Sequence, residues 1–353
     1  MNVEPLVFTT REDTATVDGP RPTLDSPGVE NVHVGSIAVV SVDGGLVHWV
    51  GDPHWPTFTR STLKAFQALP FIREGGASRF GWDASRVALM CASHSGETMH
   101  TGIVRSMLAS VDCQESDLQC GCHAPGWYAA LGRSPPADGR WSPLEHNCSG
   151  KHAGFLAACR LHGEAVSDYL DPTAALQRRI ADAVATMAAV DRDDMARGTD
   201  GCSAPNYRLP LSRLALLYAL LAQGAAAPRE GDSLQALFEA MTAHPLLVSG
   251  TARSDLSLMT LGGGDWVTKI GADGVQAIGI RSLGLGIAIK VTDGSRDALF
   301  CAVVEVLRQL GLVGANDASM PADFGAWHRT QLRNARGRVT GRIVPAFKLR
   351  SAA

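Results

Sequence analysis

The sequence predicts an α+β fold in which strands from both ends of the chain form one antiparallel sheet flanked by helices. Strand-like runs occur near the beginning, at Val32–Gly51, and again over residues 265–292. The segment between them, about residues 98–262, is mostly helical in its periodicity. We therefore expect a single domain over residues 31–353 with a helical middle region, preceded by an extended, polar lead-in over residues 1–30.

The elements of the first half follow from short local signals. Asp43-Gly44-Gly45 separates two β-rich runs and is typical of a hairpin turn. A helix is expected over Arg60–Leu69, ending before Pro70 because proline disrupts helix interiors. Arg86–Ala92 is a short apolar run that we interpret as a strand. It enters a polar turn at residues 93–97, which a helix (98–111) and a loop-rich stretch (112–147) follow.

We predict five helices in the middle of the chain. Towards its end we predict three strands and one further helix. Leu211–Gln223 is apolar nearly all round, so we expect it to be a central buried helix. After Asp323 the tail has seven Lys or Arg and no acidic residue, and we expect it to be solvated. The other predicted helices are 149–162, 173–189, 233–243, 253–261 and 296–311, and the strands are 265–270, 275–280 and 284–292.

Composition and charge exclude several classes of protein. With 353 residues and 45% apolar residues, the chain can bury a sizeable core, so disorder throughout is excluded. Its net charge of −3 excludes a globally basic nucleic-acid binder. Apolar stretches such as Leu214–Ala222 are far shorter than the roughly 20 residues that cross a bilayer. Met1–Glu12 lacks the apolar core of a signal peptide, so we expect no secretory signal there.

Lysine is rare in this chain. Only five of the 32 basic residues are lysine, a bias that codon usage explains. A lysine in a polar, glycine-rich segment is nevertheless worth considering as a functional group. The five are Lys64, Lys151, Lys269, Lys290 and Lys348.

The first candidate pair is Ser61 and Lys64. Residues three apart on a helix lie on one face, so the amine can reach the hydroxyl. A serine becomes a strong nucleophile when a base takes its proton, and lysine serves as that base when its pKa is lowered. The alternative is an ordinary solvated helix start, since S-x-x-K alone occurs easily by chance.

The second candidate is Lys269-Ile270-Gly271, at the end of a predicted strand, where glycine would allow a ligand to approach closely. Together with Ser61-x-x-Lys64 and the turn Ser93-His94-Ser95, it resembles the motif series of serine β-lactamases and penicillin-binding proteins. Two features depart from that series: Ile270 replaces serine or threonine, and the middle motif comes early. The alternative for Lys269 is an exposed cation at a strand end.

Two further polar segments each precede or open an apolar helix. One is HNCSGKHAG at residues 146–154, where Ser149 is a candidate N-cap and the small residues permit close packing. The other is DGCSAPNY at residues 200–207. Cys148 and Cys202 with a third donor could hold Zn²⁺. The alternative is that both cysteines are small residues packing a turn.

Taken together, these segments resemble the rhizobial-type, or class 3, L-asparaginase family. The resemblance runs from about residue 30 to the C-terminus, and the pair HNCSGKH and DGC at this separation is specific. Motifs of the two commoner, threonine-based asparaginase classes are lacking. The segments that carry it are RSTLK (60–64), ASHSGE (92–97), HNCSGKH (146–152), DGC (200–202) and KIG (269–271).

The resemblance implies a fold similar to serine β-lactamases, a cytosolic homodimer, and hydrolysis of L-asparagine to aspartate and ammonia. It implies two catalytic pairs, Ser61 with Lys64 and Ser93 with Lys269. It also implies Zn²⁺ bound beside the active site, assisting substrate binding rather than the chemical step. The implied zinc ligands are Cys148, Lys151 and Cys202, with Asp200 binding the ligand or supporting the metal site.

Roles for the remaining candidates follow from chemistry. We expect Ser61 to be acylated, because the adjacent helical turn fixes its base, and Ser93 to act as a relay. The planar fork of Arg60 suits the substrate α-carboxylate, and His94 is expected to line the pocket. Two other functions remain open: a different acyl-serine hydrolase of β-lactamase-like type, and a non-enzymatic protein that binds amino acids or zinc.

Overall fold

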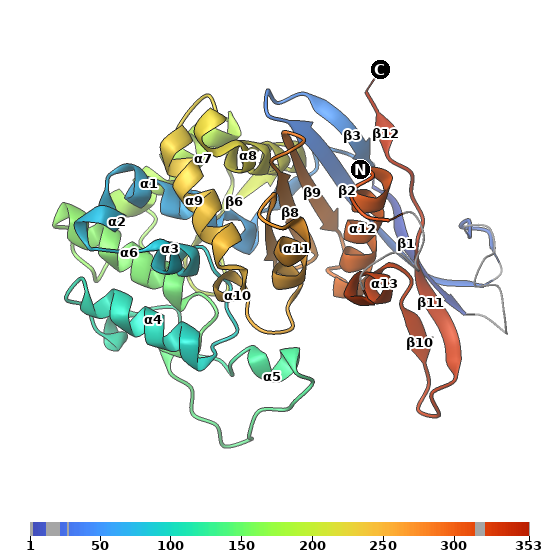
Figure 1. Cartoon of the computed structure of the whole chain (residues 1–353), viewed down its shortest axis with the longest axis horizontal. Coiled ribbons are helices and arrows are strands. Elements are labelled where there is room, and N and C mark those ends of the chain that lie inside the picture. The colour runs from blue at the N-terminus through green and yellow to red at the C-terminus, as the bar shows by residue number, and fades with distance from the viewer. Residues whose placement is uncertain (1–2, 12–21, 27, 315–321, 353) are drawn as a thin grey trace.

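The computed structural model describes residues 3–11, 22–26, 28–314 and 322–352. It has a mixed α+β fold whose sheet combines strands from both ends of the chain, as predicted (Figure 1). The lead-in expected at residues 1–30 lies partly outside the described residues. Within its described part, Glu4–Arg11 forms the first strand of the sheet.

All pairings in the main sheet are antiparallel, in the order β10-β11-β1-β2-β9-β8-β7. β3 also pairs with β2, and β12 pairs with β3. A small second sheet has the order β4-β6-β5. The strands are β1 (Glu4–Arg11), β2 (Val29–Ser41), β3 (Leu46–Val50), β4 (Pro56–Phe58), β5 (Arg197–Thr199), β6 (Pro205–Pro210), β7 (Trp266–Gly271), β8 (Val275–Ile280), β9 (Leu285–Val291), β10 (Gln331–Arg333), β11 (Val339–Pro345) and β12 (Arg350–Ser351).

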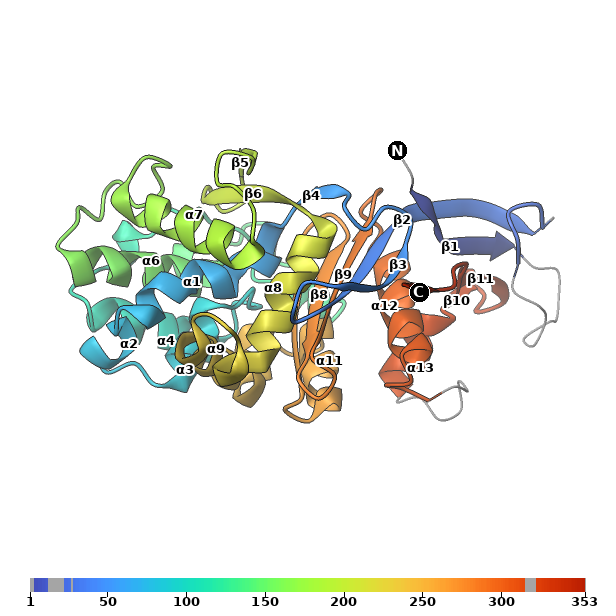
Figure 2. The same cartoon turned by 90° about the horizontal axis from the view of Figure 1, so that it is seen from above.

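Helices occupy both faces of the sheet, and most of them gather into one lobe (Figure 2). The short 3₁₀ turns of the described residues are η1 (Arg60–Leu63), η2 (Glu115–Asp117), η3 (Pro143–Glu145) and η4 (Gly224–Ala226). The α-helices are α1 (Lys64–Arg73), α2 (Gly76–Arg79), α3 (Ala84–Met90), α4 (Thr98–Ala109), α5 (Trp127–Ala130), α6 (Ser149–His162), α7 (Ala175–Ala188), α8 (Leu211–Gln223), α9 (Gly231–Ala243), α10 (Pro245–Val248), α11 (Ser254–Gly262), α12 (Arg296–Gln309) and α13 (Ala322–His328).

The sheet separates two apolar cores because successive strand residues point to opposite faces. On β2, Ala38 and Val40 belong to the core shared with the helical lobe. Their neighbours Ile37 and Val39 belong to the core under α12. Figure 2 shows this arrangement edge-on, with α8 on one face of the central strands and α12 on the other.

Helix α8 has the predicted bounds and lies directly on the sheet. A Cβ added at Gly279 of β8 would lie 2.2 Å from the carbonyl oxygen of Tyr218. One added at Gly286 of β9 would lie 1.9 Å from the carbonyl oxygen of Ala215. Both glycines therefore allow a backbone-to-backbone approach that a larger residue would prevent.

Two local predictions were wrong. The apolar run at residues 86–92, interpreted as a strand, is mostly helix α3, which packs against α6 and α9. Helix α1 does not end before Pro70 but continues to Arg73. Phe71, beyond the proline, is only 1% exposed, and its burial fixes the last helical turn despite the missing N–H.

The basic tail does not behave as the solvated segment we expected. Its strand β11 pairs with β1, so that Val7 lies opposite Pro345 and Arg11 opposite Gly341. Ile343 is buried in the core under α12. Among the described residues, no helix is both long and apolar enough to cross a membrane.

Candidate active site

The five motif segments come from separate elements. Arg60 and Ser61 lie on η1 and Lys64 begins α1, while Ser93 and His94 lie in the connection between α3 and α4. Lys269 lies on β7. The remaining candidates lie where α6 begins (Cys148, Lys151) and in the β5–β6 connection (Asp200, Cys202).

The amine of Lys64 contacts Ser93. Its Nζ donates a hydrogen bond to Ser93 Oγ at 2.8 Å and another to the carbonyl oxygen of Ala92. Lys64 and Ser93 are buried, whereas Ser61 is partly exposed. Ser61 and Lys64, one of the two expected pairs, are three residues apart in the sequence. The hydrogen bond of Lys64, however, goes to Ser93, the serine of the other expected pair.

Lys269 is fully buried beside a carboxylate that no motif marked. Its Nζ lies 3.6 Å from Asp255 Oδ2 and donates to the carbonyl oxygen of Ile270 at 2.9 Å. Burial lowers the pKa of Lys269 to about 7, since the cations of Lys64 and Arg253 add to desolvation and outweigh Asp255. A lysine of this kind is divided between ammonium and free amine at neutral pH.

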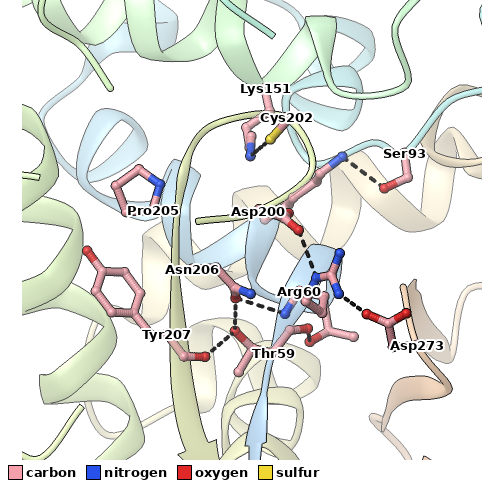
Figure 3. A network of polar contacts seen from close by, with 12 residues as sticks. Thr59, Arg60, Ser93, Lys151, Asp200, Cys202, Pro205, Asn206, Tyr207 and Asp273 are labelled. Atoms are coloured by element: carbon pink, nitrogen blue, oxygen red, sulfur yellow. Dashed lines mark hydrogen bonds and ion pairs between the residues drawn. The ribbon is translucent and has the colours of Figure 1, made fainter. Parts of the chain in front are cut away.

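Arg60 lies between two carboxylates (Figure 3). Its Nε donates to Asp200 Oδ1 at 2.8 Å, and its Nη1 contacts Asp273 Oδ2. The side chain of Asp200 is 11% exposed and that of Asp273 is 69% exposed, so the first partner is fixed and the second is exchangeable. Burial raises the pKa of Asp200, but Lys151 and Arg60 outweigh it and leave that pKa below its ordinary value.

The backbone at Arg60 is held in an uncommon conformation. Its φ of 51° lies in the left-handed region, which non-glycine residues seldom adopt. Asn206 Oδ1 accepts the Arg60 N–H at 3.0 Å and the Thr59 hydroxyl at 3.2 Å. This side chain therefore fixes the turn that presents Arg60 and Ser61.

His94 connects two motif segments. Its Nδ1 accepts the N–H of Gly96 at 3.1 Å, which leaves Nε2 as the donor to Ser149 Oγ at 2.9 Å. Ser149 Oγ in turn donates to the carbonyl oxygen of Leu144 at 2.8 Å. Burial holds the pKa of His94 well below its usual range, so the ring is neutral. Both ring nitrogens of His94 therefore bond to groups inside the protein.

The two cysteines of the predicted zinc set meet at Lys151. Lys151 Nζ donates to Cys202 Sγ at 3.0 Å, and all three side chains are buried. The hydrogen bond with Cys202 holds the pKa of the Cys148 thiol well below its usual range, against burial and aided by Lys64 and Lys151. Burial acts to lower the pKa of Lys151, but Cys202, Cys148 and Asp200 raise it above its ordinary value.

The donor chemistry of this cluster suits a zinc ion. Thiolates and nitrogen are the ligands that Zn²⁺ prefers. Nε2 of the buried His152, near Cys202, makes no hydrogen bond of ordinary geometry within the described residues. In the described part of the chain, no group of three His, Cys, Asp or Glu side chains is placed to hold a metal ion.

Small residues set the spacing of these segments. A Cβ at Gly150 would lie 2.3 Å from the carbonyl oxygen of Leu89, so α6 packs tightly on α3, as expected. At Gly271 a Cβ would lie 3.2 Å from the carbonyl oxygen of Thr59, the residue that precedes η1. The N-cap of α6 is Cys148 and not Ser149, whose hydroxyl bonds to Leu144 instead.

A cavity of about 510 Å³ opens beside Arg60. Its wall includes Asn206, Asp273 and Lys290, together with Trp55. It gives a small polar molecule access to the exchangeable side of the Arg60 guanidinium. A second cavity, of about 800 Å³, lies beyond the Ser93 turn and is lined by Glu97, Trp127 and Arg105 among others.

Three contributors to the site were missed by sequence reasoning. Asp255 lies in an ordinary helix start, TARSDLS, and Asp273 in a hairpin turn, so neither carries a motif signal. Asn206 lay inside a segment already singled out, DGCSAPNY, and it is a polar residue buried within strand β6.

Comparison with known proteins identifies the family. Residues 24–345 match the L-asparaginase II family, so the chain belongs to that family and is an asparaginase-type hydrolase acting on a small molecule. No curated protein matches the sequence.

Among solved structures, the chain is similar to crystal structures of Mglu. One has a TM-score of 0.45 at 14% identity over 79% of this chain and 67% of that one. Mglu in its native form gives a TM-score of 0.44 at 14% identity, over 80% and 66% of the two chains. The chain thus spans about two thirds of the length of these structures.

Proposed function

We propose that this member of the L-asparaginase II family hydrolyses L-asparagine to aspartate and ammonia with two serine–lysine pairs. The observation that carries the proposal is the hydrogen bond of 2.8 Å between Lys64 Nζ and Ser93 Oγ. Lys269 lies close enough to Lys64 for the two charges to interact, and η1, which carries Ser61, packs against β7, which carries Lys269. Buried amines next to serine hydroxyls are the arrangement that acyl transfer to serine requires.

The proposed reaction has two halves. The Ser61 hydroxyl oxygen attacks the side-chain carbonyl carbon of asparagine, and its proton passes through the Ser93 hydroxyl to the free amine of Lys269, while Lys64 holds the Ser93 hydroxyl in place through its hydrogen bond. The carbon–nitrogen bond then breaks, and ammonia leaves with a proton from the site. Water attacks the resulting β-aspartyl ester, which releases aspartate and returns the proton to Ser61.

Lys269 supplies the second amine. Because its pKa is about 7, it can take up and give back a proton near neutral pH. As an ammonium it would also offset the negative charge that develops on the carbonyl oxygen. The family resemblance implies that Ser93 pairs with Lys269, and we propose that this pair carries the proton transfer.

Arg60 is proposed to bind the α-carboxylate of the substrate. Its exposed partner Asp273 would be displaced, while the buried Asp200 keeps the guanidinium oriented. Asp200 is also proposed to bind the substrate or to support the metal site. His94 is proposed to line the pocket, with its ring held in place by its hydrogen bond to Ser149.

The zinc ion implied by the resemblance would be held by Cys148, Lys151 and Cys202. Bound there, it would supply a fixed positive charge and a Lewis-acidic contact that assists substrate binding. Lys151 can only be a ligand as a neutral amine, so metal binding must release its proton.

We further propose a β-lactamase-like fold family, a single catalytic domain over residues 31–353, a homodimeric assembly and a cytoplasmic location. The antiparallel sheet flanked by helices supports the first of these. The resemblance supports the others. Light scattering of the purified protein tests the homodimer.

The deciding experiment is ammonia release from L-asparagine and L-glutamine by the wild type, Ser61→Ala and Ser93→Ala. We expect turnover of asparagine by the wild type and its loss in both variants. Full activity in either variant contradicts the serine–lysine mechanism.

A stable covalent adduct with a β-lactam or an activated ester, without turnover of asparagine, would instead identify another acyl-serine hydrolase. Tight binding of asparagine without product would identify a binding protein.

A further inference from the structure

We propose that Asp255 is a positioning residue that holds the Lys269 amine in place for the proposed hydrolysis. The proposal deepens the proposed function and rests on it for the role of Lys269. Asp255 lies in the first turn of α11, and Lys269 lies on β7, against which α11 packs. Both side chains are about 1% exposed.

Every hydrogen bond described for the Asp255 carboxylate goes to the sheet. Oδ2 accepts the N–H of Ile270 at 2.9 Å and lies 3.6 Å from Lys269 Nζ. Oδ1 accepts the Thr268 hydroxyl at 3.0 Å and the Gln276 amide at 3.1 Å. The Asp255 carboxylate therefore accepts hydrogen bonds from both residues that flank Lys269 and forms an ion pair with the lysine amine.

The position of β7 makes this grip possible. Among the described residues β7 is the last strand in the main sheet, and one of its edges faces no other described strand. A backbone N–H on such an edge needs another acceptor when it is covered. Asp255 supplies that acceptor at Ile270. The same carboxylate thus caps the edge and sets the direction of the neighbouring amine.

The charges around the pair explain why a negative partner matters. Lys64 on α1 and Arg253 at the start of α11 both face Lys269 as cations, and Cys148 before α6 faces it as a thiolate that partly offsets them. Asp255 also faces Tyr218 of α8. A buried ammonium among two cations needs a carboxylate close by, because desolvation otherwise expels its charge. Asp255 is the carboxylate in contact with it.

A purely structural edge cap and a positioning residue make different predictions for the lysine. Without the carboxylate, the Lys269 ammonium loses its anionic partner but keeps both cations, so its pKa must fall further. An edge cap alone would affect folding but leave the kcat of the folded variant unchanged. The scarcity of lysine makes the measurement practical, since the chain has only five.

The test is an NMR titration of the full chain labelled with ¹³C,¹⁵N-lysine, with the Lys269 signal assigned from Lys269→Arg. Asp255→Asn should lower the Lys269 midpoint by about one pH unit or more. It should also lower kcat at least about tenfold with little change in KM. Asp265→Asn is the matched control, because it removes a carboxylate at the other end of β7 that bonds to Ser282. It should change neither.

An unchanged Lys269 midpoint in folded Asp255→Asn overturns the proposal and leaves Asp255 as an edge cap. If that variant does not fold, Asp255→Glu decides the question. It retains the charge but moves it by one methylene, so we expect a near-normal midpoint with kcat reduced about tenfold. An unchanged kcat in Asp255→Glu would overturn the positioning role. Should the wild type release no ammonia from asparagine, the proposed function fails, whereas the titration still tests the Asp255–Lys269 pairing.

Discussion

Two fully buried lysines lie at opposite ends of the candidate site, and their surroundings push their charges in opposite directions. At the thiol end, Lys151 has Cys202, Cys148 and Asp200 around it, and its pKa is raised despite burial. At the strand end, Lys269 has Asp255 but also faces Lys64 and Arg253, and its pKa falls to about 7. Equal burial therefore does not mean equal chemistry. The sign and number of close charges decide which lysine stays an ammonium and which can act as a base.

The largest expected effect comes from removing the base at the strand end. Lys269→Met should retain the fold and lower kcat/KM for asparagine at least about a thousandfold, because the buried site loses both a proton acceptor and a cation. Ammonia release measures the activity, and circular dichroism checks the fold. The exposed Lys348 provides the control, since Lys348→Met removes a charge far from the site. If Lys269→Met were nearly as active as the wild type, Lys269 would not be the base, and the proposed difference in role between Lys269 and Lys151 would be wrong.

The pH dependence of the reaction tests the same lysine without mutation. A lysine whose pKa is lowered to about 7 is a free amine above that pH and an ammonium below it. If Lys269 must be neutral to accept a proton, kcat/KM should fall about tenfold for each pH unit below about 7. Initial rates over a range of buffers measure this. A profile that stays flat well below pH 7 would show that Lys269 is not the base.

Metal removal tests the thiol end. If zinc assists substrate binding only, chelation should raise KM for asparagine about tenfold and change kcat much less, since uniform binding energy affects KM. Added Zn²⁺ should restore KM and release protons, because Lys151 must lose its proton to become a ligand. Elemental analysis and proton release are readouts besides activity. A collapse of kcat on chelation would place the thiol end in the chemical step instead.

The smallest effect is expected at the mouth of the site. Asp273→Asn removes the exposed partner of Arg60, so a substrate carboxylate no longer competes with it. Exposed ion pairs contribute at most about 1 kcal/mol, so KM should fall by about two- to fivefold. Asp182→Asn is a matched control, since it removes a similarly exposed carboxylate paired with Arg192 at 2.7 Å. A higher KM in Asp273→Asn would mean that Asp273 itself binds substrate.

Much of the fold could be predicted from the sequence because periodic signals are local. Helix α8 and strands β7 to β9 lie where their patterns placed them. The apolar run of α3 was misassigned, since seven residues without clear periodicity fit a buried strand or a buried helix equally well. Strand β1 was not predicted, because its partner β11 lies more than three hundred residues away in the sequence.

The site was predictable as a set of segments but not as a set of contacts. Spacing placed Ser61 and Lys64 on one turn, yet the long side chain of Lys64 reaches across to Ser93. Asp255 and Asp273 act through tertiary neighbours, which a single sequence does not reveal. Charged residues in a helix start or a turn are usually solvated, so composition could not distinguish these two from the rest.

The pairing of β1 with β11 has a consequence for synthesis on the ribosome. Strand β1 emerges first, but its partners β2 and β11 span residues 29–41 and 339–345. At about 5–20 residues per second, the second partner follows roughly 17–70 s later, so one edge of β1 stays open for most of translation. β2 likewise waits for β9. The nascent chain must therefore keep β-rich segments from pairing with other chains until β11 appears, a period in which chaperone binding would matter most.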